Sequence, residues 1–165
     1  MSDRLNDFLR AKYPRLIPEV FGFECFDGWL QLLDDFFSVV DRELPEGATF
    51  RLLQVKEKLG GLRIYFRLDD DIDDEISQRI HDAYDRAAAR SYRTCEICGK
   101  RGRFSKRGGL LTVVCEEHQI DGDGRKAVPQ EPEADYYRRA NREQWQRFDY
   151  DANVFVPCDP PEDQE

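Results

Sequence analysis

Residues 94–118, TCEICGKRGRFSKRGGLLTVVCEEH, contain the most specific pattern in this chain. Cys95 and Cys98 are separated by two residues, a spacing that lets two thiolates converge on one ion. After sixteen intervening residues, Cys115 and His118 repeat the spacing with one sulfur and one nitrogen ligand. Two such pairs supply the four donors of a tetrahedral zinc site. The sequence therefore predicts that these three cysteines and this histidine bind Zn²⁺.

The residues between the two ligand pairs carry a hairpin signal of their own. Gly108-Gly109 separates a polar run from an apolar run, as expected for a tight turn between two strands. A knuckle with two ligands, a hairpin, and two further ligands at the start of a helix is the plan of a treble-clef zinc finger. A zinc ribbon would instead take both pairs from turns. We expect a treble-clef-like finger over residues 92–120, with a helix beginning near Cys115.

The predicted role of the zinc is structural, because four protein ligands leave it no open position for water. Zinc is favoured over a disulfide or unliganded thiols, since five cysteines are an odd number without the regular spacing of a secreted framework. An HNH-type nuclease is excluded because residues 99–114 contain no histidine to act as general base. Cys25 and Cys158 are interpreted as incidental, with Cys25 buried near the first long helix.

Residues 1–91 alternate helical and strand patterns and predict an α+β domain. A short helix capped by Ser2 should end at Pro14, and residues 27–44 should form a long helix. Residues 69–91 predict another, with acids in its first turn that suit the positive end of the helix dipole. We interpret the apolar stripes of these helices as core. The stripes comprise Leu5, Phe8 and Leu9; then Trp29, Leu33, Phe36 and Val40; then Ile72, Ile76, Ile80 and Tyr84.

Residues 50–68, FRLLQVKEKLGGLRIYFRL, contain the clearest hairpin signal in the chain. Gly60-Gly61 predicts a two-residue turn that gives the strands an apolar face and a basic face centred on Tyr65. Glu57 falls on the apolar face, and two interpretations stay open. Either the register is slipped or the side chain reaches solvent near the turn, or the carboxylate is oriented to contact a partner or ligand. The predicted pairs are Leu59 with Leu62, Val55 with Phe66, Leu53 with Leu68, Lys58 with Arg63, Lys56 with Tyr65, and Gln54 with Arg67.

The net charge of −9 gives no reason to expect global attraction to nucleic acid or to an anionic membrane. Two basic segments, within residues 50–68 and 99–114, depart from this average. They form either a partner-binding surface or ion pairs with the acidic stretch at 69–75. The candidate partner-binding residues are Lys56, Lys58, Arg63, Tyr65, Arg67, Arg101, Arg103, Lys106 and Arg107.

The remainder of the chain is predicted to be less compact. Residues 121–132 have the composition of a linker, and residues 133–165 suggest a C-terminal helix over 133–149 followed by a disordered acidic tail. No apolar run is long enough for a membrane span or a signal peptide, so we expect a cytoplasmic protein. The whole is an α+β fold, with helices packed on a small antiparallel, hairpin-based sheet and joined to the treble-clef-like finger.

The ordered combination of motifs resembles a group of small uncharacterised bacterial and phage-associated proteins. DGWLQLLDDF, LQVKEKLGGLRIYF, TCEICG and CEEH correspond to that group's Gly-Trp helix, VKEKFGGLRFY-like hairpin and TCExCG…CxxH finger. The resemblance spans about residues 27–118. It departs from the group at Leu59 and Leu110, where aromatic side chains are usual. The resemblance implies a zinc site and a bacterial cytoplasmic origin, and it implies no particular activity.

Three functions are compatible with these patterns. A closed metal site, small size and negative charge favour a non-enzymatic zinc-stabilised protein-binding module, such as an immunity, inhibitor or adaptor protein acting on a basic partner. The alternative is a nucleic-acid-binding zinc-finger protein that uses the basic hairpins. An enzyme ranks third, because no nucleophile–base pair is visible. A deep pocket lined by Glu57, His81 or the acidic stretch 69–75 would favour it.

Overall fold

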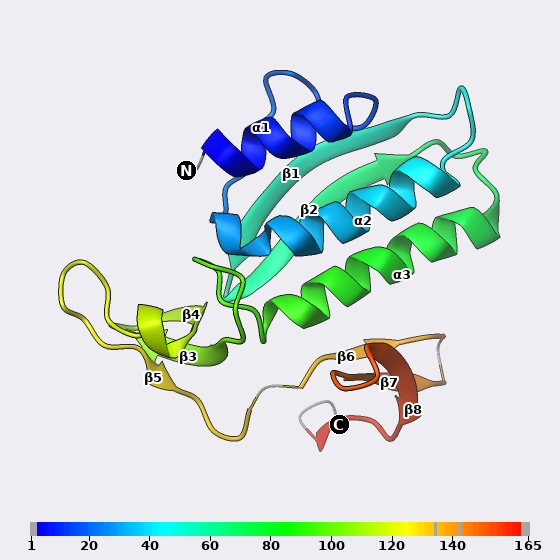
Figure 1. Cartoon of the computed structure of the whole chain (residues 1–165). Helices are drawn as coiled ribbons and strands as arrows, with labels where there is room; N and C mark the ends of the chain where they lie inside the picture. The colour runs from blue at the N-terminus through cyan, green and yellow to red at the C-terminus, as the bar shows by residue number, and fades with distance from the viewer. Residues whose placement is uncertain (1–2, 134, 142, 163–165) are drawn as a thin grey trace.

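Figure 1 shows the computed structural model, which describes residues 3–133, 135–141 and 143–162. The fold is α+β, as predicted, with three α-helices and three small antiparallel sheets. It consists of a helical body (residues 3–91), a finger (residues 92–130) and a C-terminal sheet (residues 137–158). None of the described helices is long and apolar enough to cross a membrane.

The helical body packs its helices along one antiparallel hairpin. Helices α2 and α3 lie side by side along the hairpin, and α1 lies on the β1 side (Figure 1). The predicted stripe of α2 is buried throughout, from Trp29 to Val40, which confirms it as core. In α1, Leu5 and Leu9 are buried but Phe8 is exposed, so its placement in the core was wrong. The elements are α1 (Asp3–Lys12), the 3-10 turn η1 (Asp27–Trp29), α2 (Leu30–Glu43), β1 (Phe50–Lys58), β2 (Gly61–Leu68) and α3 (Asp74–Ser91).

The turn of the β1–β2 hairpin lies one residue earlier than predicted. Lys58 pairs with Gly61, so Leu59 and Gly60 form the turn, with φ angles of 54° and 79°. Gly61 is therefore a strand residue, and packing explains its glycine: a Cβ there would lie 2.6 Å from the Cζ atom of Tyr92. The sequence signal was correct for a hairpin, but the second glycine serves packing, and counting it as a turn residue shifted the register.

A β-bulge also changes which residues of β1 face the core. The register shifts between Leu52 and Gln54, so Leu52 and Val55 are both buried while Leu53 is exposed. The predicted pairs of this strand, including Leu53 with Leu68, are therefore wrong. Glu57 pairs with Leu62, so the register slip left open from the sequence is present.

The helix ends differ from the sequence interpretation in small ways. A 3-10 turn precedes α2, and its cap position is Phe26, which makes no side-chain capping bond. The acidic start of α3 is confirmed: the carboxylate of Asp73 accepts the backbone N–H of Glu75 at 2.9 Å. The predicted cap at Ser2 falls outside the described residues.

The finger is a three-stranded sheet. One predicted ligand pair precedes its β3–β4 hairpin in the sequence, and the other follows it. Its elements are β3 (Arg103–Arg107), β4 (Leu110–Val114), the 3-10 turn η2 (Glu116–His118) and β5 (Val128–Pro129). The expected helix after Cys115 is only this single 3-10 turn. The predicted linker is also wrong, because β5 pairs with β3 and Ala127 is fully buried in the finger. The chain after the last ligand closes the finger instead of leaving it.

The predicted C-terminal helix over 133–149 is wrong, and so is the disorder predicted for the residues up to Cys158. The end of the predicted tail, residues 163–165, lies outside the described residues. The described residues form an antiparallel sheet of β6 (Tyr137–Arg139), β7 (Trp145–Asp149) and β8 (Val154–Cys158). The sheet docks on α3, where Arg138 donates to Asp82 at 2.6 Å and to Asp85 at 2.9 Å. Buried Phe148 is its centre. Helix-forming residues on its solvent side produced the misleading pattern, and tertiary packing overrides such propensities.

Candidate metal centre and adjoining cleft

The four predicted ligands converge. The Sγ atoms of Cys95, Cys98 and Cys115 and one ring nitrogen of His118 all lie within 4.8 Å of one another. Sulfur to sulfur is 3.7 Å between Cys98 and Cys115, and the Nδ1 atom of His118 is 3.2 Å from the sulfur of Cys115 and 3.7 Å from that of Cys95. Tetrahedral bonds of about 2.3 Å to sulfur and about 2.0–2.1 Å to nitrogen imply ligand separations of roughly 3.5–3.8 Å. The cluster can therefore hold a metal ion.

Backbone hydrogen bonds shape the knuckle around the first ligand pair. The N–H of Gly99 donates to the carbonyl of Cys95 at 2.9 Å, and the N–H of Cys95 donates to the carbonyl of Lys100 at 2.8 Å. Gly99 has a φ of 79°, which only glycine adopts without strain. The tight turn thus brings the two sulfurs together before any ion is considered.

The knuckle is fixed to the helical body at Gly28 and Trp29. The N–H of Gly28 donates to the carbonyl of Glu96 at 2.9 Å, and the indole N–H of Trp29 donates to that of Thr94 at 3.2 Å. A Cβ on Gly28 would collide with the carbonyl oxygen of Cys95. The knuckle is therefore positioned on the helical body by its contacts with Gly28 and Trp29.

The thiols of the cluster differ in acidity. Burial raises the pKa of Cys95 to about 11. Burial also acts on Cys115, but hydrogen bonds from His118 and from the neighbouring sulfurs outweigh it and lower that pKa to about 7. A metal ion binds thiolates, so its binding would release protons from this cluster.

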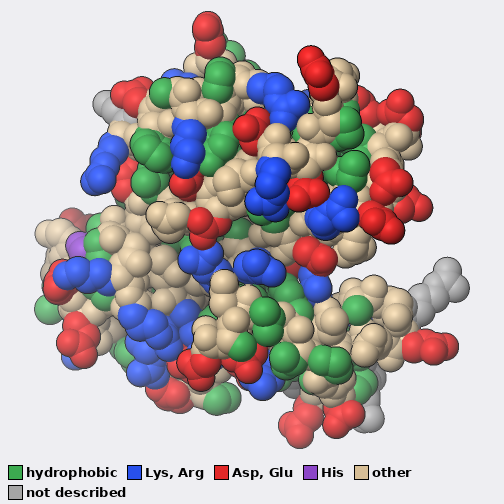
Figure 2. All heavy atoms as spheres, turned by 45° about the vertical axis from the view of Figure 1, so that its right-hand side comes forward, with side chains coloured by type: hydrophobic (Ala, Val, Ile, Leu, Met, Phe, Trp, Pro, Cys, Tyr) green, Lys and Arg blue, Asp and Glu red, His purple; other side chains and the backbone are tan. Residues whose placement is uncertain are grey.

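Several of the predicted partner-binding cations are engaged by other groups of this chain. Arg63 donates to the hydroxyl of Tyr92 at 3.0 Å, and Arg107 donates to the carbonyl oxygen of His118 at 2.7 Å. Arg101 pairs with Glu133 at 2.6 Å, and Arg103 pairs with Glu131 and Glu133. Cations and carboxylates are interspersed over the face in Figure 2.

The remaining predicted partner-binding residues are Lys56, Lys58, Tyr65, Arg67 and Lys106. Among the described residues, no carboxylate forms an ion pair with Lys56, Lys58, Arg67 or Lys106. The predicted ion pairs of these four cations with the acidic stretch 69–75 are therefore absent from the described residues. Lys56, Lys58, Tyr65 and Arg67 lie on the face of β1–β2 that points away from the core, because they alternate with buried residues. The ammonium group of Lys56 lies 5.5 Å from the ring centre of Tyr65.

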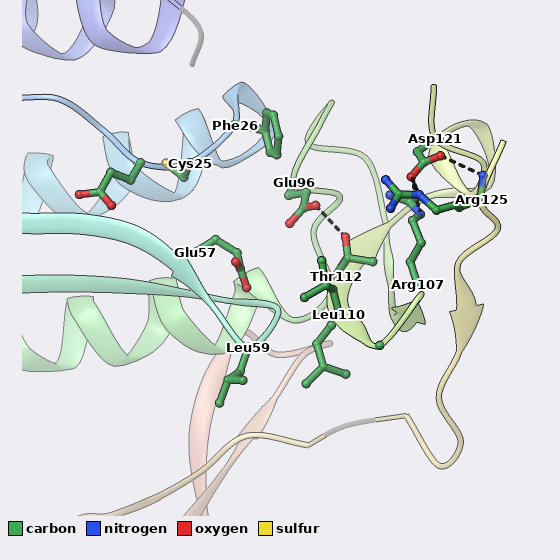
Figure 3. Close-up of a pocket in the computed structure, with 13 residues that line it drawn as sticks. Cys25, Phe26, Glu57, Leu59, Glu96, Arg107, Leu110, Thr112, Asp121 and Arg125 are labelled. Atoms are coloured by element: carbon green, nitrogen blue, oxygen red, sulfur yellow. Dashed lines mark hydrogen bonds and ion pairs between the residues drawn. The ribbon is translucent and has the colours of Figure 1, made fainter. Parts of the chain in front are cut away.

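A cleft of about 470 Å³ lies between the hairpin turn of the body and the finger (Figure 3). Three exposed apolar side chains from separate segments form its rim: Phe26 before α2, Leu59 in the β1–β2 turn and Leu110 at the start of β4. The other lining residues are Glu24, Cys25, Glu57, Glu96, Arg107, Gly109, Leu111, Thr112, Asp121 and Arg125. The cleft exists because the finger docks beside the hairpin turn.

Two carboxylates point into this cleft (Figure 3). Glu96, in the knuckle between two metal ligands, is only 8% exposed and accepts the hydroxyl proton of Thr112 at 2.7 Å. Glu57 accepts the N–H of Gly60 at 2.6 Å. Burial, and then the negative charge of Glu57, raise the pKa of Glu96 above its usual value, although Thr112 and Arg107 act in the opposite direction.

The cleft contains one cysteine that is not a predicted metal ligand. Cys25 is buried, as predicted, and burial raises its pKa to about 12. Its thiol therefore stays protonated at neutral pH and is a poor nucleophile. His81 is exposed on α3, where its Nδ1 lies 2.8 Å from the carbonyl oxygen of Ser77, and it is not part of the cleft lining.

No protein-family model, curated protein or solved structure matched this chain. The resemblance seen in the motifs therefore stays a prediction. Function is inferred from the geometry of the described residues alone.

Sequence reasoning found the four residues that can hold a metal ion and singled out Glu57, but it missed the cleft. Glu96 and Thr112 lie in motifs that were interpreted only as parts of the finger. Leu110 was noted only as a departure from a resemblance, and Leu59 only as that and as a predicted strand partner of Leu62. One signal was available: both leucines flank double-glycine turns, where an exposed large apolar side chain has no core to enter.

Proposed function

We propose that this protein is a non-enzymatic, zinc-stabilised protein-binding module, such as an immunity, inhibitor or adaptor protein, acting on a basic partner. The observation that carries the proposal is a cleft with an apolar rim, two walls of which are adjacent in sequence to the four residues that can hold a metal ion. The proposed role of the metal is to hold the walls of the cleft in place.

The donor set supports zinc. Three thiolates and one imidazole are ordinary ligands of structural zinc sites, and four protein ligands fill a tetrahedron. The first ligand pair positions Glu96, which lies between Cys95 and Cys98. The second pair follows β4, the strand that contributes Leu111 and Thr112 to the cleft. Binding of zinc would thus fix two walls of the cleft at once.

The rim of the cleft supports a protein partner. Phe26, Leu59 and Leu110 are 51%, 63% and 73% exposed, and they line the same cleft. Large apolar side chains grouped on a surface mark sites where another molecule removes them from water. With a net charge of −9, the protein would associate fastest with a basic partner.

A capture experiment with rim variants tests this proposal. The zinc-loaded protein is immobilised and challenged with bacterial lysate, next to Leu59→Asn/Leu110→Ser and to the control Val20→Ser. Asparagine suits Leu59 because it tolerates a positive φ, and Val20 is equally apolar but 95% exposed outside the cleft. We expect one stoichiometric protein that the rim variant loses and the control retains. Capture that is indifferent to the rim, or no capture, would contradict the proposal.

Nucleic-acid binding is the second candidate, and one observation favours it. Arg51 and Arg67 are directly opposite on the outer face of β1–β2, and no described carboxylate pairs with either. Like charges placed opposite each other destabilise a sheet, so an external anion would relieve them. Tyr65 on the same face offers a ring on which a base can stack.

Titration with oligonucleotides separates the two candidates. Single-stranded and duplex DNA are added at low and moderate salt to the wild type, to Lys58→Gln/Arg67→Gln and to the control Arg86→Gln/Lys126→Gln. Binding that falls with salt and is weakened only by the first variant would establish nucleic-acid binding through the hairpin. Absence of salt-dependent binding would exclude it.

A further inference from the structure

Two of the carboxylates that line the cleft, those of Glu57 and Glu96, point into it and form no ion pair with a described cation. Each uses an oxygen for a neutral hydrogen bond, Glu57 from the N–H of Gly60 and Glu96 from the hydroxyl of Thr112. No described lysine or arginine forms an ion pair with either. The cleft therefore presents two negative charges on one side.

The arginines that line the cleft are engaged elsewhere. Arg107 donates to the carbonyl oxygens of His118 and Gln119, at 2.7 and 3.2 Å. Arg125 forms ion pairs at 3.0 Å with the carboxylates of Asp121 and Asp123. These two arginines shape the finger wall, and their charge is matched by aspartates on the same wall (Figure 3).

Glu96 is the more informative of the two carboxylates. Only 8% of Glu96 is exposed, and only one of its carboxylate oxygens accepts a hydrogen bond from a described side chain. Burying a carboxylate without a cation destabilises a fold. A glutamine would keep the bond from Thr112 without that cost. The charge at this position is therefore better explained by a ligand than by the fold.

We propose that the cleft receives a lysine or arginine side chain of the basic partner. Its cationic end lies against Glu57 and Glu96, and its aliphatic part lies against the apolar rim. This inference rests on the proposed function and specifies the partner: an exposed basic residue flanked by apolar residues.

Other occupants fit the cleft less well. Two carboxylates beside leucines offer too few oxygens for a calcium or magnesium ion. An anion would be repelled by both carboxylates, and a wholly apolar side chain would leave them buried without a partner. A long basic side chain satisfies both the charge and the apolar rim, because its methylene groups cover apolar surface while its end stays polar.

A peptide titration followed by NMR tests the proposal. The zinc-loaded, ¹⁵N-labelled protein is titrated with acetyl-Leu-Lys-Leu-amide, and with the same peptide carrying glutamine or glutamate in place of lysine. We expect the lysine peptide to shift the amide signals of Gly60, Glu96 and Thr112. The glutamine peptide should bind about tenfold more weakly, the loss expected for one charge-assisted hydrogen bond.

Isosteric variants give matched controls. Glu57→Gln and Glu96→Gln keep an amide oxygen to accept the bonds from Gly60 and Thr112, so both should fold and bind zinc. Each should weaken lysine-peptide binding about tenfold. Glu19→Gln should change it less than about twofold, because Glu19 is exposed and is not part of the cleft lining.

The outcomes separate this inference from the function on which it rests. Equal binding of the lysine and glutamine peptides, or unchanged binding to both glutamine variants, would overturn the basic side-chain site. A captured partner that requires Leu59 and Leu110 but is unaffected by Glu57→Gln/Glu96→Gln would overturn the site and leave the binding module standing. A captured partner lost with both sets of variants would support both.

Discussion

The helical body and the finger are stabilised by different means. The body buries 21 side chains in one apolar cluster that includes Trp29, Phe36 and Phe37. The separate apolar cluster of the finger comprises Cys95, Val114, Cys115 and Ala127, and two of these four are predicted metal ligands. A core that small does not hold a fold by apolar burial. One chain thus combines a domain held by its core with a small module that a metal ion at the Cys/His cluster would stabilise.

Removal of the metal should have the largest effect on this comparison. Structural zinc sites contribute apparent binding free energies of about 10–16 kcal/mol. Chelation, or Cys98→Ser, should therefore unfold the finger and abolish the cleft while the body stays folded. Amide dispersion in NMR spectra and the metal content check this. Cys158→Ser is the control and should retain the metal. A finger that stays dispersed after chelation would show that its core suffices.

Truncation of the body's core should rank second. Phe36→Ala should lower the free energy of unfolding by about 3–5 kcal/mol, because it removes a fully packed ring. Urea unfolding followed by far-UV circular dichroism measures it. Phe8→Ala, at an exposed ring, should cost less than about 1 kcal/mol. Equal losses at the two positions would contradict the core assignment.

Substitution at the contact between the two regions should have an intermediate effect. Gly28→Ala places a methyl group against the carbonyl of Cys95, and such overpacking costs about 1–3 kcal/mol. We expect the loss in both the unfolding free energy and the affinity for zinc, measured by competition with a chelating dye. Gly22→Ala has open space and should change neither. A loss of stability with unchanged zinc affinity would mean that the knuckle forms independently of its contact with Gly28.

The weakest effect is expected where the C-terminal sheet docks on the body. Arg138→Gln removes a partner of Asp82 and Asp85 and should cost about 1 kcal/mol, seen as faster hydrogen exchange in β6–β8. Burial raises the pKa of Asp85, and Arg138 counteracts this. Without the arginine the pKa rises further, so the variant's defect should be present above that pKa and should diminish as pH falls through it.

Controls for this prediction lie on the same strand. Arg139→Gln removes a neighbouring cation that stacks on Trp145 instead of pairing with α3, and it should leave exchange in the sheet unchanged. A defect of Arg138→Gln that stays the same at all pH values would show that Asp85 does not contribute to it.

The parts of the fold that were predictable depend on local spacing. The four ligands were found because knuckle and 3-10 turn geometry fixes which neighbours share a side. The stripe of α2 was found because a buried helix repeats its apolar residues every three or four positions. The C-terminal sheet was missed, although Asn141 and Asp149 make side-chain turns with the backbone that follows each of them, and such residues are turn signals.

Local patterns in the sequence were enough to predict the cluster that can hold a metal ion, the buried face of α2 and two of the hairpins. The register of β1–β2 depends on tertiary packing. Gly61 is a strand residue that must lack a Cβ, because the ring of Tyr92, which is distant in sequence, lies against it. Tertiary packing also decided the cleft: Glu57 and Glu96 face one space only because the knuckle rests on Gly28. Ligand spacing and helical periodicity are set within a few residues, whereas a cleft between two units is set by how they dock.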